Sequence, residues 1–281
     1  MTSFDLRLLA VITMLIDHTA HVLLPVSSPF YMPMRIIGRL AFPIFCFLLV
    51  EGAFYTRSRK KYLWRMAASA FISVIPFDMA MNSPPRLLDV IKMGFSSSAG
   101  QTPFNKELLS SWFKSSHQNV FFTLTLGLTA IIAAEFLGGL IPRIFPAWQE
   151  LQIKYDRFLR WNFWKAVLAA PVVAACCFAA DWIRSDFGWS GVIMVALAYA
   201  FRPPAPETSP PPDRITRASS PAALAVWNIF RYFGTPQSFA AFAAVPLFFY
   251  NREPGPKKLK WGFYLFYPAH LLILALIRGL G

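Results

Sequence analysis

The sequence predicts an all-α fold, a polytopic integral membrane helix bundle of about eight to ten transmembrane helices. Hydrophobic residues make up 56% of the chain, its mean hydropathy is +0.46, and charged residues make up only 15%. A soluble domain carries about 25% charged residues, so this chain is too apolar for that class. The basic residues fall in short clusters between apolar runs, as topology signals do. The net charge of +13 is therefore attributed to membrane orientation, and we expect no nucleic-acid partner.

The apolar runs are bounded by prolines, polar residues or basic clusters, which set the expected helix ends. Three prolines in residues 25–33 indicate an extended connection between the first two helices. Residues 222–250 contain two short apolar runs, which cross the membrane twice or dip in and return. The other expected helices cover residues 6–24, 34–55, 62–81, 119–141, 166–181, 192–201 and 261–280.

Proline interrupts several of these helices. Pro43 has no N–H to donate, so the carbonyl of Arg39, one turn earlier, is left free. Pro76 interrupts the helix predicted over residues 62–81, and Pro268 frees a carbonyl in the last helix. Irregular backbone of this kind inside apolar runs indicates local departures from a straight helix.

The basic connectors predict the orientation, because Lys and Arg stay in the cytoplasm during insertion. Residues 57–65, 143–165, 202–217 and 252–260 are the basic connectors. An even number of crossings must separate them, which predicts about nine spans with the N-terminus inside and the C-terminus outside. Aromatic residues interleaved in 143–165 favour a segment lying in the headgroup region. Residues 82–118 are predicted to be an external loop, and residues 202–221, with seven prolines, a proline-rich cytoplasmic loop.

Residues 1–281 are predicted to form a single transmembrane domain, since no soluble segment of useful size is left. The first apolar run is followed directly by Asp17 and His18 without a small-residue cleavage site, so we expect a retained first helix. The three cysteines all lie in apolar runs, and their odd number gives no disulfide framework. We expect buried thiols.

Charged residues inside apolar runs are the first functional signal, because each costs about 2.5–3.5 kcal/mol on insertion. Arg39 could hold an anionic group such as a carboxylate or a coenzyme phosphate, or it is a counter-ion for Asp17 or Asp78. Glu51 is expected to pair with Arg57 or a neighbouring residue.

Asp17 and His18 form the most informative pair in the first helix. Histidine is the usual proton shuttle near neutral pH. Adjacent side chains on a helix point about 100° apart, so we expect each of the two to meet a different partner, with Arg39 as the partner of Asp17. The alternative is an ion pair and a satisfied histidine that serve only bundle packing.

Several further polar groups share the mid-membrane to outer level if depth follows the helical rise. Asn119 begins a helix, where a cap or an interhelical bond is the simplest interpretation. The chain shows no phosphate-binding glycine loop, no metal-ligand spacing and no Ser-His-Asp signature, so we expect no metal. From the residues alone, the prediction is an intramembrane polar site without an assigned reaction. The outer-level groups are Asp17, His18, Arg39, Asp78, Asp181, Asp186 and His270, the last on one face with Tyr267.

The chain resembles the TraX family in a series of motifs that keep the family's order. They are MLIDH at 14–18, GRLAFPIFCFLLVEGAFYTRS at 38–58, YLWR at 62–65, IPFD at 75–78, NVFFTLTLGL at 119–128, DFGWSGV at 186–192 and FYLFYPAHLLIL at 263–274. TraX proteins are integral inner-membrane proteins associated with N-terminal acetylation of conjugative pilin. The family is also similar to wider membrane acyltransferases, in which a histidine of the first helix precedes a Phe-rich helix ending in Gly.

The resemblance implies a multi-pass protein of the bacterial inner membrane with a cytoplasmic N-terminus. It implies that acetyl-CoA, bound from the cytoplasm, is the acyl donor and that a pilin-like protein or a glycan is the acceptor. His18 would be the general base or acyl carrier, oriented by Asp17 or another carboxylate. Substrate contacts would come from Arg39, Glu51, Asp78, Asn119, Asp186, Tyr267 and His270, and coenzyme contacts from Arg57, Arg59, Lys60, Lys61 and Arg65.

Two other classes of function stay open. A small-solute transporter would show internal inverted repeats, and no convincing repeat is present. A non-catalytic membrane scaffold would use the intramembrane charges as structural pairs. The three classes differ in one measurable respect, since only the acyltransferase transfers an acetyl group.

Overall fold

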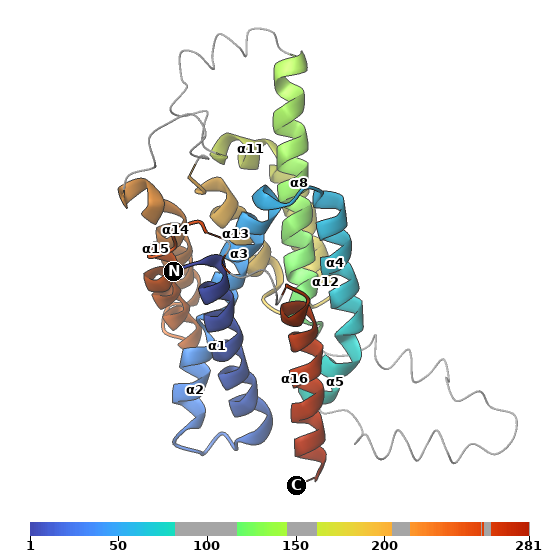
Figure 1. Ribbon diagram of the computed structural model, residues 1–281, viewed down its shortest axis with the longest axis vertical. Coiled ribbons are helices and arrows are strands. Elements are labelled where there is room, and N and C mark those ends of the chain that lie inside the picture. The colour runs from blue at the N-terminus through green and yellow to red at the C-terminus, as the bar shows by residue number, and fades with distance from the viewer. Residues whose placement is uncertain (82–116, 145–161, 204–213, 254, 256–259, 281) are drawn as a thin grey trace, which may run out of the picture.

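The computed structural model describes residues 1–81, 117–144, 162–203, 214–253, 255 and 260–280. Every regular element in this part of the chain is a helix, which confirms the all-α prediction (Figure 1). The elements are α1 (Ser3–Leu23), α2 (Tyr31–Gly38), α3 (Ala41–Tyr55), α4 (Arg59–Ile72), α5 (Val74–Met81), α8 (Val120–Ile144), α11 (Phe163–Leu168), α12 (Ala170–Trp182), α13 (Gly188–Ala200), α14 (Arg214–Tyr232), the 3-10 helix η2 (Pro236–Ala243), α15 (Ala244–Phe248) and α16 (Lys260–Leu280).

Four stretches of the described chain are long and apolar enough to cross a membrane. They are Ser3–Leu23, Tyr31–Tyr55, Val120–Ile141 and Gly262–Gly279. Three shorter apolar helical stretches, Ala170–Trp182, Gly188–Ala200 and Pro236–Phe248, accompany them. The protein is therefore a multi-pass membrane protein, and the total of about nine crossings stays a prediction.

Two of the helix interruptions lie one turn before a proline. The span expected over residues 34–55 is confirmed as the apolar stretch Tyr31–Tyr55, in which a turn at Arg39–Leu40 separates α2 from α3. The ring of Pro43 excludes a regular hydrogen bond to the carbonyl of Arg39, which agrees with a turn at Arg39–Leu40. Likewise α4 ends at Ile72, four residues before Pro76, which confirms the interruption predicted for that helix.

Two expected connections are shorter in the structure. Pro33 belongs to the first turn of α2, where its missing N–H costs no helical hydrogen bond. Helix α14 begins at Arg214 and contains Pro221, so the proline-rich loop does not extend to residue 221 as predicted. The expected external loop 82–118 and the headgroup segment 143–165 lie almost wholly outside the described residues.

Helix α3 is the centre of the bundle. Eleven of its 15 residues are buried, and its apolar residues leave no polar face, which is typical of a helix surrounded by others. Helices α1, α8 and α13 pack against it, and α16 packs against α1 and α5 (Figure 1). We call the end where α3 meets α4 the basic end, because Arg57, Lys60 and Lys61 are exposed there, and the opposite end the far end.

Candidate functional site

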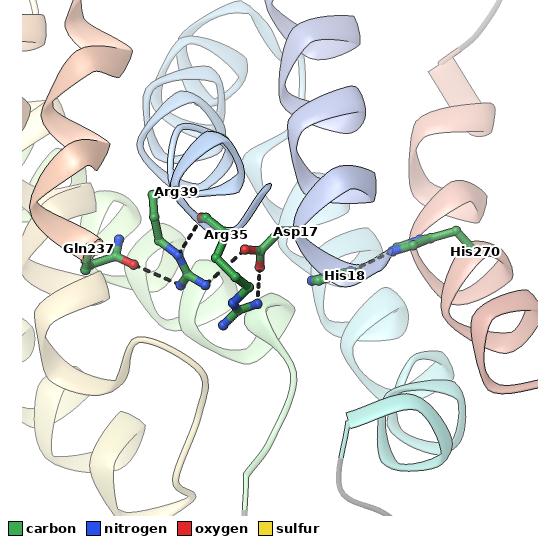
Figure 2. A network of polar contacts seen from close by, with 6 residues as sticks. All are labelled: Asp17, His18, Arg35, Arg39, Gln237 and His270. Carbon is green, nitrogen blue, oxygen red and sulfur yellow. Dashed lines mark hydrogen bonds and ion pairs between the residues drawn. The ribbon is translucent and has the colours of Figure 1, made fainter. Parts of the chain in front are cut away.

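Helix α1 directs Asp17 and His18 to different neighbours, as predicted from their spacing (Figure 2). The Asp17 carboxylate accepts hydrogen bonds from Arg35 Nη1 at 2.8 Å and Arg39 Nη2 at 3.0 Å. His18 Nδ1 lies 2.7 Å from Nε2 of His270 on α16. The predicted contact between Asp17 and Arg39 is therefore confirmed, and His18 has a different partner.

The arginine pair belongs to the break between α2 and α3. Arg39 also donates to Gln237 Oε1 at 3.0 Å and to the backbone carbonyl of Arg35 at 3.2 Å, so its planar guanidinium is held in three directions. Helices α1 and α2 approach closely at Gly38, where an added Cβ would lie 2.2 Å from Cβ of Asp17. The absence of a side chain at Gly38 thus allows the carboxylate to reach both arginines.

The histidine pair joins the first and last described helices. The two rings are parallel within 5°, with centroids 5.0 Å apart. His270 is only 4% exposed, and its Nδ1 lies 2.8 Å from the backbone oxygen of Phe266 one turn earlier. Tyr267 meets His18 edge to face, with ring centroids 6.1 Å apart. The imidazole of His18 is therefore positioned by ring contacts and by one hydrogen bond with His270 of α16.

A cavity of about 270 Å³ opens beside His18 and contains the Asp17–arginine cluster. Phe77 and Met81 of α5 and Tyr267 of α16 line it, so parts of the chain that are far apart in the sequence meet there. We call it the polar cavity. Its ionisable lining residues are Asp17, His18, His21, Arg35, Arg39, His117 and Asp186.

A second cavity of about 430 Å³ lies nearer the basic end and is lined mainly by apolar side chains of α3, α8 and α16. Arg7 and Arg65 are its cationic lining residues. We call it the apolar cavity. Met14, Phe45, Val120 and Tyr267 line both cavities, so the two adjoin at these four residues, which we call the shared wall.

His18 is adjacent to that shared wall. Met14 precedes it by one helical turn on the same face of α1, and Tyr267 contacts its ring. An imidazole in this place can exchange a proton with a group in the polar cavity, close to a reactant that enters from the apolar cavity.

Glu51, a predicted substrate contact, lies in neither cavity. It is buried at the basic end, where its Oε1 accepts a hydrogen bond from Arg202 Nε at 2.6 Å. The expected partner, Arg57 or a residue near it in the sequence, is therefore wrong. Arg57 is exposed, and α13 brings Arg202 to Glu51 across 151 positions of sequence.

Two further predicted contacts also lie outside the lining of both cavities. Asp78 is buried on α5, next to the lining residue Phe77. Asn119 accepts from the backbone N–H of Phe121 and donates to the carbonyl of Ala70 at 2.8 Å, so it is both a helix cap and an interhelical link. Asp186 and Tyr267 do line the polar cavity, whereas His270 lies behind His18.

The basic cluster proposed for the coenzyme separates into different environments. Arg65 lines the apolar cavity. Arg59 donates to Glu135 Oε2 at 3.1 Å, in a cluster that also includes Lys165 and Tyr199. The others, Arg57, Lys60 and Lys61, are exposed at the basic end.

The sequence analysis missed Arg7, Arg35 and Glu135 as site or network residues. A signal existed for each. Arg7 precedes His18 by 11 residues, close to three helical turns, so the two share one face of α1. Arg35 is one turn before Arg39, and Glu135 is a carboxylate in the middle of a 25-residue apolar helix.

The fold and the site together define a class, an all-helical multi-pass membrane protein with a polar site enclosed by its helices. The family model described as TraX protein matches residues 4–278. The chain therefore belongs to the TraX family, which confirms the resemblance.

Among curated proteins, the chain is similar to the probable fimbrial assembly protein FimC, serogroup H1, of Dichelobacter nodosus. The two are 33% identical over 153 residues, which cover 51% of this chain and 59% of that protein. The chain thus spans about three fifths of the length of this relative. No solved structure matches the chain.

Proposed function

We propose that this protein is a membrane-embedded acyltransferase that moves an acetyl group from acetyl-CoA to a membrane-associated acceptor. The carrying observation is His18, which lines the polar cavity beside the wall that this cavity shares with the apolar one. Membership of the TraX family and the similarity to a fimbrial assembly protein support a role in pilus-related processes.

The donor enters the apolar cavity from the basic end. Arg7 and Arg65 are suited to the coenzyme phosphates, because guanidinium groups bind phosphate through paired hydrogen bonds. From Arg7 to His18 the rise along α1 is about 16 Å, a length that an extended pantetheine arm can span. The apolar lining suits that uncharged arm, and the thioester would lie near His18.

The acceptor occupies the polar cavity from the far end. Its amine or hydroxyl group approaches His18. The charged side chains of Arg39 and Asp186 contact other polar groups of the acceptor. A pilin-like N-terminus and a glycan hydroxyl both satisfy this chemistry.

Two chemical routes fit an imidazole in this place. As a general base, His18 takes the proton of the acceptor while the acceptor attacks the thioester carbonyl, and the thiolate of coenzyme A leaves and receives that proton. As an acyl carrier, the ring attacks the thioester first, the thiol leaves, and the acceptor then attacks the acetyl-imidazole. In both routes one thioester bond breaks and one amide or ester bond forms.

The proposed function also includes an orientation of the protein in the membrane. Because the basic end carries exposed Lys and Arg residues, we place it and the N-terminus in the cytoplasm, where acetyl-CoA is available. The far end then faces outward, and the membrane is the bacterial inner membrane. Reaction of an impermeant cysteine reagent with single cysteines at the two ends checks this placement.

The test is acetyl transfer by the purified protein in lipid nanodiscs, with labelled acetyl-CoA and either a peptide with a free N-terminus or a glycan. We expect transfer by the wild type and a loss of about 100-fold or more in His18→Ala, the range for a removed general base. Leu15→Ala, on the lipid-facing side of the same helix, is the matched control and should keep wild-type activity.

Each variant is first checked for a monodisperse elution profile and an unchanged melting temperature. Transfer at the wild-type rate by folded His18→Ala would overturn the catalytic assignment. Wild-type protein that transfers nothing to either acceptor class would instead favour a scaffold or transporter.

A further inference from the structure

The tautomer of His270 follows from its contact with the backbone. Its Nδ1 lies 2.8 Å from the carbonyl oxygen of Phe266, and a carbonyl oxygen can only accept a hydrogen bond. Nδ1 of His270 therefore carries a proton. In a neutral imidazole only one nitrogen is protonated, so Nε2 of His270 is an acceptor.

The same reasoning carries over to His18. Its Nδ1 lies 2.7 Å from Nε2 of His270, so it is His18 that donates in this bond. The proton of neutral His18 is thereby placed on Nδ1, and Nε2 keeps its lone pair. That nitrogen is the one able to take a proton from an acceptor or to attack a thioester.

The two histidines differ in access to the cavity. His18 lines the polar cavity, whereas His270 is 4% exposed and is not among the lining residues. We propose that His270 is a positioning residue, which holds His18 in the tautomer with an unprotonated Nε2 and acts on the reaction only through it. The catalytic consequence rests on the proposed acetyl transfer, but the tautomer does not.

The proton balance gives His270 a second effect on the same step. When Nε2 of His18 takes the acceptor's proton, His18 becomes an imidazolium whose Nδ1–H still donates to His270 Nε2. The neutral ring of His270 accepts this hydrogen bond and so stabilises the His18 cation. A carboxylate has the same effect in other enzymes, but it carries a charge. The proton then passes to the leaving thiolate, and the pair returns to its starting state.

A matched pair of substitutions separates hydrogen bonding from ring packing. His270→Phe keeps an aromatic ring against His18, whose ring plane is parallel within 5°, but removes the acceptor nitrogen. His270→Gln loses the ring but offers an amide oxygen as acceptor. We expect kcat to fall about 100-fold in His270→Phe, with KM for acetyl-CoA within about twofold of wild type, and a substantial recovery of kcat in His270→Gln.

Full kcat in folded His270→Phe would overturn the positioning role, and so would a loss in His270→Gln as large as in His270→Phe. A wild type without any transfer would contradict the proposed function instead, and the tautomer is then measured directly.

Nitrogen-15 NMR of histidine-labelled protein distinguishes protonated from unprotonated ring nitrogens without any turnover. The His18 signals are assigned by their loss in His18→Ala. We expect Nδ1 protonated and Nε2 unprotonated in the wild type, and a mixture of tautomers in His270→Phe. Predominant protonation of Nε2 in the wild type would overturn the inference.

Discussion

Arg202 and Glu51 form an ion pair at 2.6 Å in which each side chain is only 4% exposed. The guanidinium also lies over the ring of Phe54, 3.9 Å from its centroid. The pair connects the end of α13 to the end of α3 at the basic end of the bundle. An isolated charge in this place would be costly, because it has lost water on all sides.

Removing one member of this pair should destabilise the fold strongly. We expect Glu51→Ala to lower the free energy of unfolding by about 3–5 kcal/mol, because Arg202 is left buried without its counter-ion. The double variant Glu51→Met with Arg202→Met should recover most of that loss. Melting temperatures in one detergent compare the three proteins. If the double variant is less stable than the single one, the unpaired charge is not the cause.

The contact between α1 and α2 makes a second prediction at Gly38. An added methyl group would lie 2.2 Å from Cβ of Asp17, so Gly38→Ala must push the helices apart, at a cost of about 1–3 kcal/mol. The control is Gly139→Ala, where nothing lies within 4 Å of the new methyl group, and helix propensity favours alanine. We expect a lower melting temperature only for Gly38→Ala. A melting temperature of Gly38→Ala equal to that of the wild type would contradict the close approach of α1 and α2.

The turn before α13 contains a group that titrates near neutral pH. Loss of hydration raises the pKa of Asp186 to about 6, well above its usual value of 3.8. The folded state therefore binds this proton more tightly than the unfolded state, so the carboxyl's contribution to stability falls as pH rises from about 4 to 6.

We accordingly expect Asp186→Asn to raise the melting temperature more at pH 7.5 than at pH 5. At pH 5 the wild-type carboxyl is mostly protonated and resembles the amide. At pH 7.5 it is ionised, and its raised pKa corresponds to a loss of about 3 kcal/mol in the free energy of unfolding. The measurement is thermal unfolding of both proteins across this range. A difference that does not change with pH would show that the carboxyl titrates elsewhere.

The apolar cavity makes a prediction about the donor. We expect Arg7→Ala and Arg65→Ala each to raise KM for acetyl-CoA about 10-fold or more, because a charge-assisted hydrogen bond to phosphate is worth about 1.5–3 kcal/mol. Arg184→Ala is the control, since Arg184 is exposed in the turn after α12. Initial rates over a range of acetyl-CoA concentrations give KM and kcat separately. Unchanged KM in both cavity variants would place the coenzyme elsewhere.

Local sequence was sufficient for the features that depend on neighbours in the chain. The backbone interruption before Pro76 follows from a missing N–H and a ring clash one turn back, which any sequence with that proline shares. The different directions of Asp17 and His18 follow from helical geometry. Because Asp17 is anionic, its partner was expected to be a cation at a similar depth in the membrane. Arg39 met both conditions, and the structure shows this contact.

Contacts between segments far apart in the sequence could not be predicted in this way. Several basic residues lay at a suitable depth for Glu51, and sequence proximity favoured Arg57. The true partner depends on how α13 packs against α3, which is decided by side-chain shape along both helices rather than by charge. The same holds for the division of the basic cluster between the apolar cavity, the Glu135 cluster and the surface.

By itself the sequence determined that this chain is a helical membrane protein with costly polar groups in its first two spans, because hydrophobic runs, prolines and charges act locally. Only the tertiary structure decided that His18 meets His270 across 252 positions and that His18 lines a polar cavity next to an apolar one. The physical reason is that an apolar helix can pack on many faces with similar energy. Which face meets which neighbour is settled only when all the helices pack together.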